Sequence, residues 1–381
     1  MDLIQRRSLL VGIAAAAVCA AGAFQEPQQF FRSYLMAYLF WIAIPLGCLA
    51  LVMLHNLVGG GWGFLILRFL EAGTRTLPLM ALLVAPILLG LPRLYIWARP
   101  DAVAADHLLQ HKSVFLNVPF FLGRTALYFA VWMLLAYFLN RWSSEQDRRE
   151  DPVLRRRLNN ISGPGLVLYA LTVSLASLDW VMSLEPGWFS TIYSALFMAG
   201  QVLSTLAFAI VVLVILASRS SLSEILLPRY LNDLGNLLMT FVILWAYMAF
   251  SQFLIVWAGN LPDEIAWYLP RLKGGWQWMA WALIVFHFVL PLLLLLFRRV
   301  KRKIRLLSTV AAAMLVIRLL DVFWTVKPAF DHGGLRFHWL DWGLLAAMGG
   351  IWVAVFFWQL KRKPLLPLHD PWLREVLAQN A

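Results

Sequence analysis

The sequence predicts an all-α, polytopic membrane protein with about ten transmembrane helices. Its 381 residues are 61% hydrophobic and only 14% charged, and the mean hydropathy is +0.73, which is too apolar for a soluble domain. Apolar runs long enough to cross a hydrocarbon core of roughly 30 Å recur along the whole chain. Because a helix satisfies its own backbone hydrogen bonds in lipid, we expect each run to be helical.

These runs predict a single integral membrane domain over residues 1–381. Residues 1–33 hold the first span and its outer loop, and residues 361–381 form a tail after the last span. Arg6 and Arg7 before an Ala-rich run also fit a cleaved signal peptide, whose removal would leave nine spans. In chain order the ten predicted spans are Ser8–Phe24, Tyr34–Leu54, Thr76–Trp97, Pro119–Leu139, Pro164–Met182, Thr191–Ala217, Asn236–Trp257, Trp276–Phe297, Ile304–Trp324 and Leu340–Leu360.

The stretch between the second and third spans, residues 59–75, predicts an interfacial helix. In a helical projection Phe64 and Leu67 fall on one side, whereas Arg68 and Glu71 are on a more polar side. A helix with this division lies along the membrane surface, with its apolar side toward the acyl chains. We therefore expect this stretch to precede the third span without crossing the membrane.

The basic residues predict the orientation of the chain. Most of the 32 Lys and Arg residues fall on the amino-terminal side of the spans, notably in the loops at residues 141–162 and 298–305. Cytoplasmic loops collect Lys and Arg, so both termini are expected in the cytoplasm. This bias also explains the net charge of +12 without nucleic acid as a partner, and membrane lipids are the expected contact of the basic loops.

Cysteine and histidine usage argues against a redox cofactor or metal held by this chain. Cys19 and Cys48 lie within apolar runs, and no CxxC or CxxCH sequence occurs. A dihaem cytochrome b needs paired axial histidines within the bilayer, whereas His287 is the only histidine deep in a predicted span. Any haem or iron–sulfur cluster is therefore expected in partner subunits.

Ionisable residues inside the spans are the candidate functional residues, because buried charge in a membrane is costly. At 1.5 Å per residue, Asp179 and Arg318 lie roughly 22 Å and 21 Å from the starts of their spans. Asp321 follows Arg318 at i+3 on the same helix face. The sequence thus allows a cluster of Asp179, Arg318 and Asp321, with a structural ion pair of Arg318 and Asp321 alone as the alternative. Arg93 and Arg124, near span ends, are expected to extend to the membrane surface.

A proton path is the functional hypothesis for these residues. An acid that is buried beside a cation experiences opposed effects and can both accept and donate a proton. Asp179 is the predicted relay, Glu185 the exit group, and the entry route consists of His287, Tyr169, Ser174 and His55. The alternative is that these polar groups only hold the helices together.

Four stretches of the chain carry a family resemblance: NVPFFLGRTALYFAVWMLLAY, LASLDWVMSLEPGWFSTIYSALFMAGQ, FSQFLIVWAGNLPDEIAWYLPR and KRKPLLPLHDP. They resemble the ActF family, the second NrfD-like (polysulfide-reductase-C-like) membrane subunits of alternative complex III. The resemblance implies two four-helix bundles from spans two to five and six to nine. These comprise residues 34–140 with 164–182, and residues 191–325, while the first span and the last span, 340–360, are peripheral.

The resemblance also implies a function. Alternative complex III is a bacterial respiratory or photosynthetic complex of the cytoplasmic membrane that oxidises quinol and reduces cytochrome c or a downstream oxidase, and an ActF-like chain is a non-catalytic subunit of it. Haem c and iron–sulfur clusters are then expected in its partners, a multihaem cytochrome c and an iron–sulfur subunit. An ActC-like sister is the expected quinol site, so weak or absent quinone binding is expected here. The alternatives are a purely structural scaffold and an independent transporter. The transporter is the weakest, because Gly/Pro-broken helices do not occur at matching positions in two halves.

Overall fold

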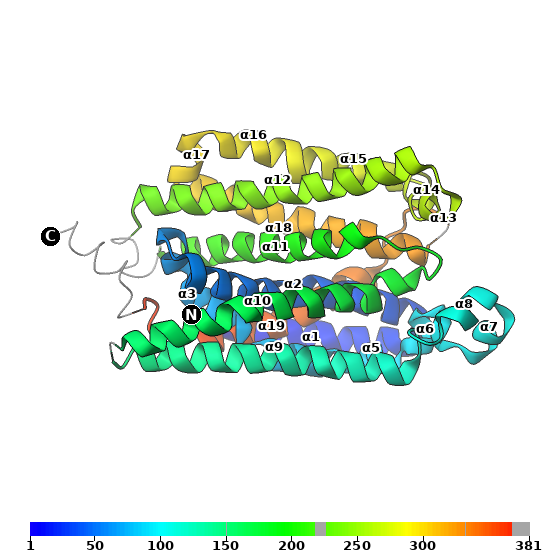
Figure 1. The fold of residues 1–381 in the computed structure, drawn as a ribbon, viewed down its shortest axis with the longest axis horizontal. Coiled ribbons are helices and arrows are strands. Elements are labelled where there is room, and N and C mark those ends of the chain that lie inside the picture. The colour runs from blue at the N-terminus through cyan, green and yellow to red at the C-terminus, as the bar shows by residue number, and fades with distance from the viewer. Residues whose placement is uncertain (150, 218–225, 332, 368–381) are drawn as a thin grey trace.

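The computed structural model describes residues 1–381 except 150, 218–225, 332 and 368–381. The described residues form helices and connecting turns, and none of them lies in a strand. Long helices run side by side along the long axis of the molecule, and the short helices α6 to α8, α13 and α14 gather at one end (Figure 1). The all-α fold class is confirmed.

Ten helical segments of the described residues are long and apolar enough to cross a membrane, as predicted. Eight are continuous helices: α1 (Asp2–Gln25), α2 (Pro27–Val58), α9 (Val118–Gln146), α10 (Pro152–Trp180), α11 (Thr191–Ala217), α12 (Pro228–Gly259), α18 (Ile304–Val326) and α19 (Trp339–Leu360). The third segment is broken into α3 (Gly61–Thr74), α4 (Leu77–Leu83) and α5 (Ala85–Leu89). The eighth consists of α15 (Trp276–Ala282), the π-helix η4 (Leu283–Val289) and α16 (Leu290–Leu296).

The predicted interfacial helix at residues 59–75 is wrong. This stretch forms α3, in which every residue except Trp62 is buried, and α3 begins the third apolar segment at Gly61. Its polar side faces protein because Arg68 and Glu71 pair with each other and with other elements. Beyond α3, prolines in the first turns of α4, α5 and α6 (Leu91–Leu94) break the segment, since proline cannot continue the hydrogen bonds of the helix before it.

The spanning helices pack in two groups. Helices α2, α3, α9 and α10 contact one another, and α11, α12, α18 and the α15–η4–α16 segment form a second group. Helix α2 packs along α11 and joins the groups, whereas α19 lies against α2 and α1 lies against α19. We call the end of the bundle where α1 begins the basic end, and the other the opposite end (Figure 1).

Helix α1 is attached to α19 by glycine contacts. A Cβ atom on Gly12 would lie 2.6 Å from the backbone nitrogen of Ile351, and one on Gly350 would lie 2.5 Å from the Cα of Gly12. The two backbones therefore touch, as in other closely packed membrane helix pairs. Side chains cannot be added at this crossing without moving α1.

We expect Gly350→Ala to destabilise the packing of α1 by about 1–3 kcal/mol, because the added methyl group overpacks a backbone contact. The expected readout is a lower thermal midpoint in detergent and faster proteolysis of α1. Gly123→Ala is the matched control, since a Cβ there meets nothing within 4 Å. Equal midpoints for the two variants would contradict the close crossing.

Candidate functional site

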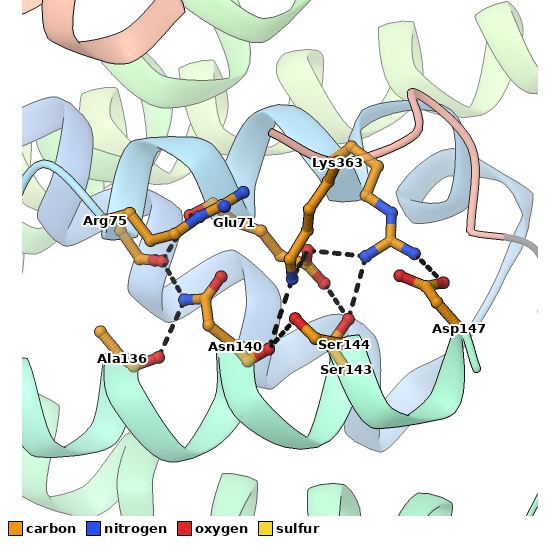
Figure 2. Close-up of polar contacts among 10 residues, drawn as sticks. Glu71, Arg75, Ala136, Asn140, Ser143, Ser144, Asp147 and Lys363 are labelled. Atoms are coloured by element: carbon orange, nitrogen blue, oxygen red, sulfur yellow. Dashed lines mark hydrogen bonds and ion pairs between the residues drawn. The ribbon is translucent and has the colours of Figure 1, made fainter. Parts of the chain in front are cut away.

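Buried charged side chains of the described residues form separate groups. The group nearest the basic end surrounds Glu71, whose side chain is 2% exposed. Arg68, one turn earlier on α3, places Nη1 2.8 Å from one carboxylate oxygen, and the Lys363 ammonium lies 3.0 Å from the same oxygen. The hydroxyl of Ser143 on α9 donates a hydrogen bond to the other oxygen. Figure 2 shows Glu71 between the carboxy-terminal tail and α9.

A second carboxylate shares the guanidinium of Arg68. Asp147, directly after α9, pairs with Nη2 of Arg68 and is 14% exposed. Asn140, two turns earlier on α9, donates from its side-chain amide to the Thr74 hydroxyl at 2.8 Å. Its backbone carbonyl accepts from Lys363 at 3.3 Å (Figure 2). We call Arg68, Glu71, Ser143, Asp147 and Lys363 the Glu71 centre. It joins α3, α9 and the tail.

A cavity of about 140 Å³ borders the Glu71 centre. Glu71 and Ser143 lie in its wall, and His55 of α2 lines it as well. Its rim includes Arg155 and Asn159 of α10, both exposed at the basic end. A water molecule occupies about 30 Å³ in the liquid, so the cavity has room for several waters between the basic end and the buried carboxylate.

Asp179 lies at the end of α10 and is fully buried. It accepts two hydrogen bonds from Arg124 of α9, at 2.7 Å from Nη2 and 2.9 Å from Nε, and one from the Tyr128 hydroxyl at 2.7 Å. The prediction that Asp179 forms a cluster with Arg318 is wrong, and so is the prediction that Arg124 extends to the membrane surface. The helix rise fixes the depth of a residue, but not which helix lies beside it.

Arg318 and Asp321 form an ion pair on α18, which confirms the alternative that the sequence left open. Nε of Arg318 also lies 3.3 Å from the Ser204 hydroxyl on α11. The guanidinium lies so close to Gly200 that a Cβ atom there would be 2.2 Å from Nη2. A cavity of about 30 Å³ borders the pair and is also lined by Tyr193 and Thr325.

His287 is fully buried in the π-helix η4, with its ring centroid 3.8 Å from that of Trp245. Neither ring nitrogen has a hydrogen-bond partner among the described residues. Pro291 lies one turn later and lacks the N–H that an α-helix would direct to the His287 carbonyl, which favours an irregular turn here. His287 therefore belongs to the second helix group, apart from Asp179.

Glu185 is held by Arg271 at 2.8 Å, and the Arg271 side chain is fully buried. Arg271 also donates to the carbonyls of Thr325 at 2.7 Å and Trp267 at 2.6 Å. Burial lowers the pKa of Arg271, and the charge of Glu185 opposes this shift. Thr325 also lines the cavity beside Asp321, so this pair closes the opposite end of the bundle near that cavity.

The remaining predicted path residues make local contacts. The Tyr169 hydroxyl donates to Gln201 at 2.6 Å, and the Ser174 carbonyl accepts from the Ser177 hydroxyl at 2.7 Å. His55 lines the cavity beside Glu71. The predicted set is thus distributed over several sites, and its members do not form one hydrogen-bonded cluster among the described residues.

Sequence reasoning placed Glu71 near the cytoplasmic mouth with His55, but it did not predict the partners of the buried acids, namely Arg68, Ser143 and Lys363 for Glu71, Arg124 for Asp179 and Arg271 for Glu185. The signal for one of these contacts was present, because Arg68 and Glu71 have the same i, i+3 spacing as Arg318 and Asp321, within an equally apolar run. In the described part of the chain, no three His, Cys, Asp or Glu side chains lie together in a way that could hold a metal ion.

Comparison with protein-family models gives no match to this chain, and comparison with curated protein sequences gives none either.

Proposed function

We propose that this chain is a proton-conducting, cofactor-free membrane subunit of a bacterial quinol-oxidising complex of the alternative complex III type. In this proposal the chain lies in the cytoplasmic membrane with both termini, and thus the basic end, in the cytoplasm. The observation that carries it is the Glu71 centre, where a carboxylate 2% exposed borders a cavity that leads in from the basic end. Ionisable groups at such positions in a membrane protein commonly belong to ion pathways.

Polar residues beyond the Glu71 centre support a route toward the opposite end. Gln201 and Ser204 lie one turn apart on α11, where Gln201 accepts from Tyr169 and Ser204 contacts Arg318. The Arg318–Asp321 pair then borders the second cavity, beside which Glu185 and Arg271 close the bundle. Burial disfavours a charged carboxylate and nearby cations favour it, so such paired acids can exchange protons. Asp179, on the other helix group, remains a candidate relay.

A scaffold subunit is the second candidate function. The contacts of Asp179 favour it, because two hydrogen bonds from Arg124 and one from Tyr128 satisfy this carboxylate and pin α10 to α9. An independent transporter has less support. A transporter built from two repeats is expected to have broken helices at the same position in both. Here the broken α3–α5 segment is the second spanning segment of the first helix group, whereas η4 interrupts the third spanning segment of the second group, so the positions differ.

We expect the chain to co-purify with c-type haem from its native membrane in mild detergent, because the redox centres of the proposed complex lie in partner subunits. Separated from those partners, the chain is expected to show no Soret absorption and no stoichiometric iron. The measurement is an absorption spectrum with iron analysis before and after dissociation. A stable chain that purifies alone would contradict the complex and favour transport, and a haem b spectrum that is lost in His287→Ala would contradict the cofactor assignment.

A further inference from the structure

The tail after α19 folds back over the basic end and is held at several points. Lys361 pairs with Asp2 at the start of α1, and the Arg362 guanidinium lies 3.5 Å from the centre of the Trp358 ring. Leu365 and Leu366 pack against the apolar core. Pro364 prevents the helix from continuing. These contacts fix the backbone on both sides of Lys363.

Lys363 reaches from this tail into the protein. Its ammonium lies 3.0 Å from the Glu71 carboxylate and 3.3 Å from the Asn140 carbonyl, and the side chain is only 12% exposed. Burial lowers the pKa of Lys363, while the charge of Glu71 opposes this shift. Lys363 thus brings a positive charge to Glu71 from outside the spanning helices.

Lys363 supplies one of the two cations in ion-pair contact with the carboxylates of the Glu71 centre. Glu71 and Asp147 are the two carboxylates, and Arg68 is shared between them. Without Lys363, Arg68 would be the one cation of the described residues within ion-pair distance of both, and Glu71 is the more buried of the two carboxylates. A carboxylate that loses a cation at this range and burial binds a proton more readily.

We propose that Lys363 is a positioning residue that sets the proton occupancy of Glu71, so that the tail controls how readily the Glu71 centre loads a proton. This inference deepens the proposed function and rests on it for its role in conduction, although the effect of Lys363 on the carboxylate can be measured without transport. In this proposal, water in the cavity carries the proton to Glu71, and the tail sets how readily Glu71 accepts it.

Other charged groups also face the Glu71 centre. Arg75, directly after α3, donates from Nε to the Glu71 backbone carbonyl at 3.3 Å, and Arg362 of the tail lies near Arg75. The titratable His55 of α2 and Arg155 of α10 line the cavity. Among the described residues, Lys363 is the one that supplies a cation to the Glu71 carboxylate from outside α3. Its removal therefore changes the charge at Glu71 while α3 stays intact.

The test is the reaction of Glu71 with dicyclohexylcarbodiimide in membranes that contain the intact complex. This reagent attacks protonated carboxyl groups in apolar surroundings. The loss of the unmodified Glu71 peptide is followed by mass spectrometry as a function of pH, and the pH of half-maximal reaction reports proton occupancy separately from reagent access. In Lys363→Met we expect this midpoint to move to higher pH by about one unit, which is on the order of tenfold more reaction at neutral pH.

The control variants separate charge from structure. Lys363→Arg is expected to restore the wild-type midpoint, and Lys361→Met, which removes only the pair with Asp2, is expected to leave it unchanged. If Lys363→Met does not assemble, Lys363→Gln replaces it, because Gln keeps a hydrogen-bond donor without the charge. An unchanged midpoint in the neutral variant, or an equal shift in Lys361→Met, would overturn the inference.

The outcome for Lys363 can be distinguished from the outcome for the proposed function. Suppose that Lys363→Met shifts the midpoint of the Glu71 reaction, but Glu71→Gln leaves the proton-to-electron ratio unchanged. Lys363 would then still set the proton occupancy of Glu71, and the proposed role of Glu71 in conduction would be wrong. Suppose instead that Lys363→Met leaves the midpoint unchanged, but Glu71→Gln lowers the ratio. Lys363 would then not set the proton occupancy of Glu71, and the proposed function would stand.

Discussion

Arg124→Gln is expected to destabilise the protein by roughly 3–5 kcal/mol, because it leaves a buried carboxylate without its cation. Asp179 is fully buried, and Arg124 supplies two of its three side-chain hydrogen bonds, so only the bond from Tyr128 would remain. The measurement is the thermal midpoint of the purified complex in detergent, together with the fraction that assembles.

The double variant Arg124→Gln with Asp179→Asn is expected to recover most of this loss, since it removes both charges together. Arg93→Gln is the control, because Arg93 is exposed and lies over the Phe31 ring 5.3 Å from its centre. A double variant no more stable than Arg124→Gln would contradict the pairing. If Asp179 is also a relay, the assembled Asp179→Asn complex will transfer fewer protons per electron, and an unchanged ratio would leave Asp179 as an anchor alone.

Glu71→Gln is expected to give the largest functional effect. Glutamine has nearly the same shape; its amide oxygen can accept from Arg68 and its amide nitrogen can donate to the Ser143 hydroxyl, so the complex is expected to assemble and to oxidise quinol in detergent. It cannot take up a proton at this position, so transfer from the basic end is expected to stop. Assembly is checked by gel filtration, and the rate of quinol oxidation in detergent is expected to stay within about twofold of wild type.

Several properties that belong to a single helix were predictable from the sequence. Hydropathy predicted the ten apolar segments, and the i, i+3 spacing predicted the pair of Arg318 and Asp321. Both follow from the helix itself, through the length that spans a bilayer and the face on which a side chain lies. These features need no knowledge of neighbouring helices.

Relations between helices were not predictable in the same way. Arg124 reaches Asp179 because α9 packs beside α10, and depth along each helix says nothing about that contact. Lys363 reaches Glu71 across 292 positions of sequence, from a tail that has no periodic pattern. Arg68 and Glu71 suggested a surface helix, because polar residues that pair inside a protein give the same pattern as residues that face water.

If protons enter this chain at Glu71, the proton-to-electron ratio of the complex in sealed vesicles depends on that carboxylate. The comparison is between wild type, Glu71→Gln and Glu145→Gln, where Glu145 is a more exposed carboxylate on α9 paired with Arg141. We expect a ratio that falls in Glu71→Gln and stays at the wild-type value in Glu145→Gln. A wild-type ratio in vesicles that contain the assembled Glu71→Gln complex would contradict it.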